Sequence, residues 1–168
     1  LSNIVKHITE IAAEDNYKAH QLWLDKIPAE IFIGNLKQKY NYKAEPYKIV
    51  PIIGEYDEPA AQKQDLLTID LTKTNTLIYG RADSGREDLA STIIYSTIIE
   101  HSPEEINFYI IDFGSETLKM YSKAPHVGEV CTVDDGEQII NMFVMIDKEL
   151  ELIELGVLDQ KCFDYKTY

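Results

Sequence analysis

Two glycines, Gly80 and Gly85, have the spacing of the frame G-x-x-x-x-G, in which backbone N–H groups bind phosphate. Such a loop lies between a strand and a helix, and the positive N-terminal end of the helix adds to the site. Here an apolar run at 76–79 precedes the loop, and a helical pattern begins at Asp88. We therefore predict a phosphate-binding loop that consists of Gly80, Arg81, Ala82, Asp83, Ser84, Gly85, Arg86 and Glu87.

Both positions that carry the chemistry of such a loop are altered in this sequence. A working loop continues with Lys, which contacts the β- and γ-phosphates, and with Ser or Thr, whose hydroxyl holds Mg²⁺. Arg86 takes the lysine position, where its planar fork replaces a compact ammonium group. Glu87 takes the hydroxyl position, and one like-charge contact with a triphosphate at about 4 Å costs roughly 4 kcal/mol at an effective dielectric constant of about 20. We expect weak binding of ATP and Mg²⁺, or none.

The formal charge of the loop favours the same interpretation. From residue 80 to residue 88 there are two arginines against three carboxylates, which leaves a formal charge of −1. An ordinary phosphate loop is net positive, because it must attract a polyanion. We therefore favour a loop that preserves the fold but binds nucleotide weakly or not at all. A site that binds and hydrolyses ATP at useful rates is the alternative.

The composition is that of one globular domain, with 168 residues of which 45% are apolar and 27% are charged. The net charge of −13 argues against a nucleic-acid partner, because a protein that binds phosphate backbones needs a basic surface. No apolar run is long enough to span a bilayer, and no secretion signal is visible. The chain starts with Leu1 rather than Met, so we expect it to be a piece of a longer protein.

Other residues of types that are common in catalytic and metal sites have simpler structural interpretations. Cys131 and Cys162 lack the spacing of metal ligands or of a redox motif, so we expect reduced thiols. His126 has no ligand partner at a suitable spacing, and we expect a loop histidine. The carboxylate pairs Glu104-Glu105 and Asp134-Asp135 lie at predicted turns and are interpreted as solvated residues at helix starts.

The spacing of apolar residues predicts the elements that must hold the loop in place. The expected helices cover 3–15, 88–100, 115–122 and 136–155, with a weaker helical turn within 28–35. The expected strands cover 47–54, 66–71, 76–79, 106–112 and 129–132. An irregular connector is expected over 37–48 and a turn over 55–59. The alternation of strands and helices predicts an α/β domain with a parallel sheet.

Four motifs follow one another along the chain and carry a family resemblance. They are Ile53-Gly54-Glu55-Tyr56-Asp57-Glu58-Pro59, the altered loop at 80–87, Asn107-Phe108-Tyr109-Ile110-Ile111-Asp112-Phe113-Gly114, and Ala124-Pro125-His126-Val127-Gly128. The third and fourth motifs are the most specific. On these motifs, the stretch from Pro51 to Gly156 resembles the FtsK/SpoIIIE-type ATPase domains of the type VII secretion motor, an EssC/EccC-like protein.

The resemblance implies a P-loop NTPase fold of the RecA-like type, a three-layer αβα sandwich with a mostly parallel sheet. It also implies that the domain is incomplete at the C-terminus, because the Walker B strand is expected after about residue 168. Residues 1–45, which include Leu22-Trp23-Leu24, resemble the helical linker before the second ATPase domain of the motor. We expect this linker to pack on the domain. Residues 46–168 are then a partial FtsK/SpoIIIE-like ATPase domain.

Two further features have two interpretations each. Asp112 resembles a family position near the nucleotide or the next subunit, and the alternative is a structural role at the end of its strand. Trp23 and the tyrosine-rich segment 37–47 either form a docking surface or cover the sheet edge of the domain itself.

The resemblance implies a module of a membrane-anchored bacterial motor, on the cytoplasmic side of the cell membrane, that exports small helical-hairpin proteins. In such motors the later ATPase domains are often degenerate and regulate export or dock substrate, which agrees with the altered loop. The expected partners are adjacent ATPase domains of the same chain, other motor subunits and the secreted proteins, and no nucleic acid is expected. The alternatives are an active ATP-hydrolysing motor domain completed by neighbouring domains and a DNA translocase domain of the same fold family.

Overall fold

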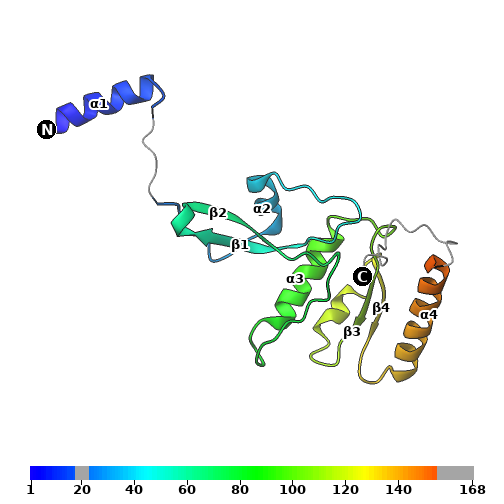
Figure 1. The fold of residues 1–168 in the computed structure, drawn as a ribbon. Coiled ribbons are helices and arrows are strands. Elements are labelled where there is room, and N and C mark those ends of the chain that lie inside the picture. Colours follow the sequence, from blue (N-terminus) through cyan, green and yellow to red (C-terminus); the bar gives the residue numbers. More distant parts are fainter. Residues whose placement is uncertain (18–22, 155–168) are drawn as a thin grey trace.

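The computed structural model describes residues 1–17 and 23–154, whose arrangement is shown in Figure 1. The helices are α1 (Ser2–Glu14), α2 (Ile33–Tyr40), α3 (Arg86–Ile98) and α4 (Gly136–Glu154), with the 3-10 helices η1 (Pro59–Ala61) and η2 (Thr117–Tyr121). The strands are β1 (Ile52–Glu58), β2 (Lys63–Thr68), β3 (Phe108–Ile111) and β4 (Val127–Cys131). Leu22, Gly156 and Cys162, which entered the predictions, lie outside the described residues.

The hydrophobic core lies between α3 and the parallel pair β3–β4. The most hydrophobic run of the sequence forms β3, which pairs with β4 so that Ile110 is opposite Val130. Ile94 of α3 packs with these two residues and with Val127, and each of the four is at most 9% exposed. Continuous apolar runs are typical of parallel strands that are covered by helices. This packing fixes α3 against the pair and places its N-terminal turn near the end of β3.

Strands β1 and β2 form a separate antiparallel pair, and this pair corrects two predicted boundaries. The strand predicted over 47–54 starts too early, and most of the turn predicted over 55–59 belongs to β1. The chain reverses later, where Pro59 opens η1 and Gln62 adopts a left-handed φ of 50°. Of the charged residues that suggested a turn, Asp57 and Glu58 lie at the exposed end of β1, whereas the side chain of Glu55 is buried beside Lys39 and Tyr40.

The segment predicted to be an irregular connector, 37–48, begins within a helix. α2 extends to Tyr40 and buries Leu36, which is 3% exposed. Lys39 and Tyr40 both donate hydrogen bonds to the Glu55 carboxylate on β1. α2 has only 8 residues, and a helix this short depends on such tertiary contacts rather than on its own propensity. The prediction was therefore wrong for 37–40.

Residues 76–79, predicted to be a strand, do not form one in the described part of the chain. Leu77 is 74% exposed and Tyr79 is 85% exposed, and none of the described strands pairs with the segment. An apolar run becomes a strand only when a neighbour takes up its backbone N–H and C=O groups. The segment still leads the chain directly into Gly80 and the loop.

The N-terminal part of the chain contains an exposed helix, α1, and a tyrosine-rich segment that contacts the domain. None of the residues of α1 is buried, and Trp23 is 77% exposed, so the packing of α1 on the domain stays a prediction. The tyrosines further along contact the domain: Tyr40 binds Glu55, and the Tyr42 hydroxyl donates to the Val50 carbonyl at 2.7 Å. These two contacts support the interpretation that the tyrosine-rich segment covers the domain beside β1.

Candidate functional site

The predicted phosphate loop runs directly into α3, and two residues with a left-handed backbone make the turn. Gly85 has a φ of 82° and precedes the first residue of the helix, and Asp83 has a φ of 59°. Glycine adopts this conformation at no steric cost, and aspartate is one of the few other residues that visits it. The Ser84 N–H donates to the Arg81 carbonyl at 3.3 Å. The first turn of α3 and its free N–H groups therefore face the loop.

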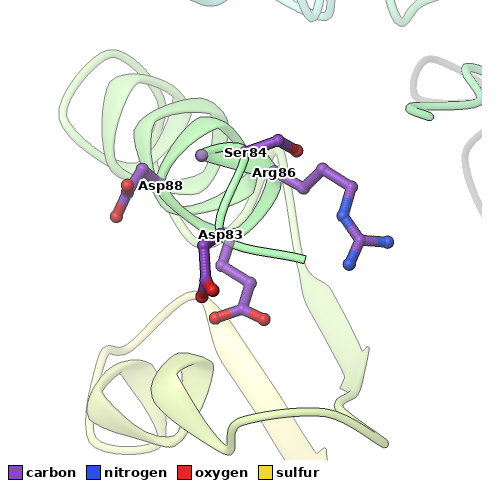
Figure 2. Close-up of a pocket in the computed structure, with 6 residues that line it drawn as sticks. Asp83, Ser84, Arg86 and Asp88 are labelled. Carbon is purple, nitrogen blue, oxygen red and sulfur yellow. The ribbon is translucent and has the colours of Figure 1, made fainter. Parts of the chain in front are cut away.

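The loop folds closely over Gly80. A Cβ atom at this position would lie 2.2 Å from Ser84 Oγ and 2.9 Å from Arg86 Cγ, so a larger residue fits only if these two side chains move. The Ser84 hydroxyl and the aliphatic stem of Arg86 occupy the space above the glycine. The guanidinium of Arg86 then points away from Asp83 and Asp88 (Figure 2). In this arrangement the stem of Arg86 lies over Gly80, and its charge is directed away from these two carboxylates.

A shallow hollow of about 290 Å³ lies beside the loop and is lined by residues 83–88. Three of these six residues are carboxylates, and Arg86 is the one cation among them. Arg81 and Arg86 are the only arginines in the sequence, and within the described ranges neither guanidinium has a hydrogen bond or an ion pair. The hollow is at the small end of the ~300–1,000 Å³ that is typical of ligand pockets. Its lining is acidic where a phosphate group needs positive charge.

Glu87, at the position of the metal-binding hydroxyl, is bonded to another part of the chain. Ser115 Oγ donates to Glu87 Oε2 at 2.6 Å, and Ser115 lies in the turn between β3 and η2. The Thr117 hydroxyl lies 2.9 Å from Ser115 Oγ. The carboxylate also benefits from the positive end of the α3 dipole, because Glu87 is in the first turn. Glu87 therefore has a structural role that joins α3 to the end of β3.

Asp112 lies at the end of β3, and its carboxylate shapes the same turn. Its Oδ1 accepts the Gly114 N–H at 2.9 Å, and its Oδ2 accepts the Leu118 N–H at 3.3 Å. A Cβ atom added to Gly114 would lie 3.4 Å from Asp112 Oδ1 and 3.8 Å from Glu87 Oε1, so the two carboxylates flank this glycine. Both oxygens of Asp112 are engaged by backbone, which supports the strand-ending role over a direct role at a nucleotide.

Sequence reasoning did not identify Ser115 and Thr117. The pattern that could have indicated them is the position of the two hydroxyls just after a parallel strand. In open α/β sheets, the carboxyl ends of the strands and the loops that follow them meet at one edge, where ligand sites form. The residue separation of 28 between Glu87 and Ser115 hides this contact from any local pattern.

The remaining candidates have structural surroundings. His126 is 6% exposed, and its Nε2 lies 2.8 Å from the His101 carbonyl, which fits a loop histidine. Burial raises the pKa of the Cys131 thiol, so it is held in its unreactive form. Glu105 Oε2 accepts the Ser102 N–H at 3.0 Å in a turn before β3, so the prediction of a helix start at Glu104-Glu105 was wrong.

Asp135 does precede a helix, as predicted. Its Oδ2 accepts the Thr132 N–H at 2.8 Å and the Thr132 hydroxyl at 2.7 Å, just before α4. These two bonds from Thr132, the backbone bond first, hold the pKa of the Asp135 carboxyl below its usual range. Among the residues that the structure describes, no group of three or more His, Cys, Asp or Glu side chains could hold a metal ion.

Comparison with known proteins gives these features a family context. The model of the FtsK/SpoIIIE family matches residues 44–161, which is most of the chain. The chain belongs to the FtsK/SpoIIIE family. The P-loop NTPase fold of this family confirms the predicted α/β fold, and the loop at 80–87 lies within the matched range.

The relatives are proteins of type VII secretion. ESX secretion system protein EccC of Thermomonospora curvata is 26% identical over 161 residues, which cover 89% of this chain and 12% of EccC. The structure of EssC (ATPases 2 and 3) from Geobacillus thermodenitrificans matches with a TM-score of 0.59 at 24% identity, over 68% of this chain and 22% of that one. Thermomonospora curvata EccC (ATPases 2 and 3) in complex with a signal sequence peptide matches with a TM-score of 0.57 at 28% identity, over 69% and 23%. The chain thus spans a small part of its longer relatives.

The residues of the loop do not fit the magnesium nucleotide that the family uses. The hydroxyl position holds a carboxylate that is already bonded to Ser115, and the lysine position holds an arginine whose guanidinium points away from Asp83 and Asp88 (Figure 2). As a separate finding, the described residues include no helix that is long and apolar enough to cross a membrane.

Proposed function

We propose that this chain is a degenerate ATPase-like module of a membrane-anchored type VII secretion motor, which regulates or scaffolds the export of small helical-hairpin proteins. One observation carries the proposal: the loop keeps its glycine turns, but Glu87 bonds to Ser115 at 2.6 Å instead of presenting a hydroxyl to a metal. The site has the backbone of a phosphate loop with the side chains of a structural turn.

Electrostatics supports weak nucleotide binding. A triphosphate carries several negative charges, and it would meet the carboxylates of Asp83, Glu87 and Asp88 along the hollow. One like-charge contact at about 4 Å costs roughly 4 kcal/mol at an effective dielectric constant of about 20. The guanidinium of Arg86 offsets little of this cost in its observed orientation. The N–H groups of the first turn of α3 remain the favourable part of the site.

The proposed partners follow from the relatives. EssC and EccC have been solved with ATPases 2 and 3 together, which supports adjacent ATPase domains as neighbours of this module. The complex of EccC with a signal sequence peptide supports a role in docking secreted proteins. We place the module at the cytoplasmic side of the cell membrane, with other motor subunits. The net charge of −13 disfavours DNA as a substrate and hence the DNA translocase alternative.

The experiment that tests the proposal is a titration of the purified protein with Mg-ATP, together with a turnover assay. We expect an affinity weaker than cellular ATP levels and turnover near background. Secretion by a strain whose motor carries Arg86→Ala should be retained, because Arg86 has no nucleotide to bind. Robust turnover by the native sequence, or loss of export in that strain with the protein still folded, would instead support the active ATPase.

A further inference from the structure

The bond between Glu87 and Ser115 joins two segments that are far apart in the sequence. Glu87 is in the first turn of α3, and Ser115 follows β3. Ser115 Oγ lies 2.6 Å from Glu87 Oε2 and 2.9 Å from Thr117 Oγ1. Because the single hydroxyl proton of Ser115 goes to the carboxylate, the Thr117 hydroxyl is the donor in the second bond. The two hydroxyls therefore form a chain that ends on Glu87.

The turn that holds Ser115 is itself anchored on both sides. Asp112 accepts the N–H of Gly114 before Ser115 and the N–H of Leu118 after it. Glu116, the residue that follows Ser115, adopts a left-handed φ of 57°. Such a conformation is rare for a residue with a side chain and persists where the surroundings hold it. The turn therefore presents the Ser115 hydroxyl in one direction, toward α3.

We propose that the Glu87–Ser115 bond is a latch that holds the first turn of α3 against the turn at 112–118, so that these two distant segments open together. While the latch is closed, the side chain at the metal-binding position is held by the protein's own hydroxyl. The proposal deepens the proposed function and rests on it, because it names the contact that engages the Glu87 carboxylate in the degenerate loop. Opening the latch releases both the Glu87 carboxylate and the turn after β3.

The neighbouring carboxylate shows that the contact is specific to Glu87. Asp88 is in the same first turn of α3 and gains the same benefit from the helix dipole. In the part of the chain that the structure describes, the Asp88 side chain has no hydrogen bond or ion pair. Glu87→Ala and Asp88→Ala each remove one negative charge from the same end of α3, but only Glu87→Ala removes the bond to Ser115. Asp88→Ala is therefore the matched control.

The test is amide hydrogen exchange of the segment 112–119 in the full chain, for Glu87→Ala, Ser115→Ala, the double variant and Asp88→Ala. Each single latch variant should speed exchange of the segment about threefold to tenfold, the effect of losing one solvent-exposed hydrogen bond of ordinary net strength. The double variant should exchange no faster than the faster single variant, because both changes remove one bond. Asp88→Ala should leave the segment unchanged.

Three results would overturn the latch: exchange that neither single variant changes, additive effects in the double variant, and the same acceleration in Asp88→Ala. Ser115 is exposed, so Ser115→Ala leaves the core intact, and retention of native exchange in β3 and β4 verifies the fold of each variant.

A titration of the native protein with Mg-ATP separates the proposed function from the latch. Tight binding refutes the proposed function, whereas a failed exchange cycle with weak binding refutes only the latch.

Discussion

Nucleotide affinity should be recovered when the two altered positions of the loop are repaired together. The double variant Arg86→Lys, Glu87→Thr restores the side chains of a working phosphate loop and changes the formal charge of residues 80–88 from −1 to 0. It also removes the carboxylate that Ser115 now binds. Every residue from Gly80 to Asp88 is exposed, so the variant should fold as the native protein does.

The magnitude follows from the charge that is removed. One like-charge contact with a phosphate at about 4 Å is worth roughly 4 kcal/mol at an effective dielectric constant of about 20. The loop is exposed, so salt and solvent screen part of this interaction. If about half of the free energy remains, the gain is about 2 kcal/mol, or roughly thirtyfold in the dissociation constant.

Isothermal titration with Mg-ATP at fixed ionic strength measures this gain. Asp88→Asn is the control, because it removes one charge from the same helix turn without changing the lysine or hydroxyl position. The control should give a smaller gain than the repaired variant, and Arg86→Lys alone should give little. A repaired variant that binds Mg-ATP no better than the native protein would contradict the cost assigned to Glu87. The whole gain from Arg86→Lys alone would contradict it too, because Glu87 would then be no obstacle to binding.

Two further predictions concern stability. Glu55, whose side chain is 2% exposed, accepts hydrogen bonds from Lys39 and Tyr40, so Glu55→Ala should lower the free energy of unfolding by about 2–3 kcal/mol in denaturant titration. An equal loss in Glu58→Ala, on the exposed end of β1, would contradict this role. The pKa of Asp135 lies below its ordinary 3.8, because the Thr132 backbone and hydroxyl bind the charged form. The Asp135 carboxylate therefore stabilises the fold above pH 3.8, and this stabilisation is lost as the pH falls through the lowered pKa. The free energies of unfolding of the native protein and of Asp135→Asn should converge at acid pH. A difference between them that stays constant with pH would contradict the assignment.

The long periodic elements of the fold were predictable from the sequence. α1, α3 and α4 each lie within about two residues of the expected ranges, because their apolar spacing continues over several turns. β3 was predictable for a similar reason, since a run of consecutive apolar residues suits a strand that is covered on its faces. In these elements the local pattern and the tertiary packing favour the same structure, and the local pattern is then sufficient.

The elements that sequence reasoning missed depend on contacts between distant segments. α2 has 8 residues and is held by the buried Leu36 and by the bonds from Lys39 and Tyr40 to β1, none of which has a local signature. The end of β1 is rich in charged residues, and only its pairing with β2 makes it a strand. The same limit applies to the site: the loop has a spacing that can be read directly, but its partner Ser115 is 28 residues away.

The glycines of the loop show why its spacing alone is weak evidence for nucleotide chemistry. A side chain at Gly80 would collide with Ser84 and Arg86, and Gly85 needs its left-handed backbone to start α3. Both requirements come from the fold, and they hold whether or not a phosphate ever binds. The spacing therefore reports a tight turn between an extended segment and a helix, and the chemistry is decided by the next two residues. In this chain the stem of Arg86 lies over Gly80 and Glu87 bonds to Ser115, so both side chains are in contact with the protein itself.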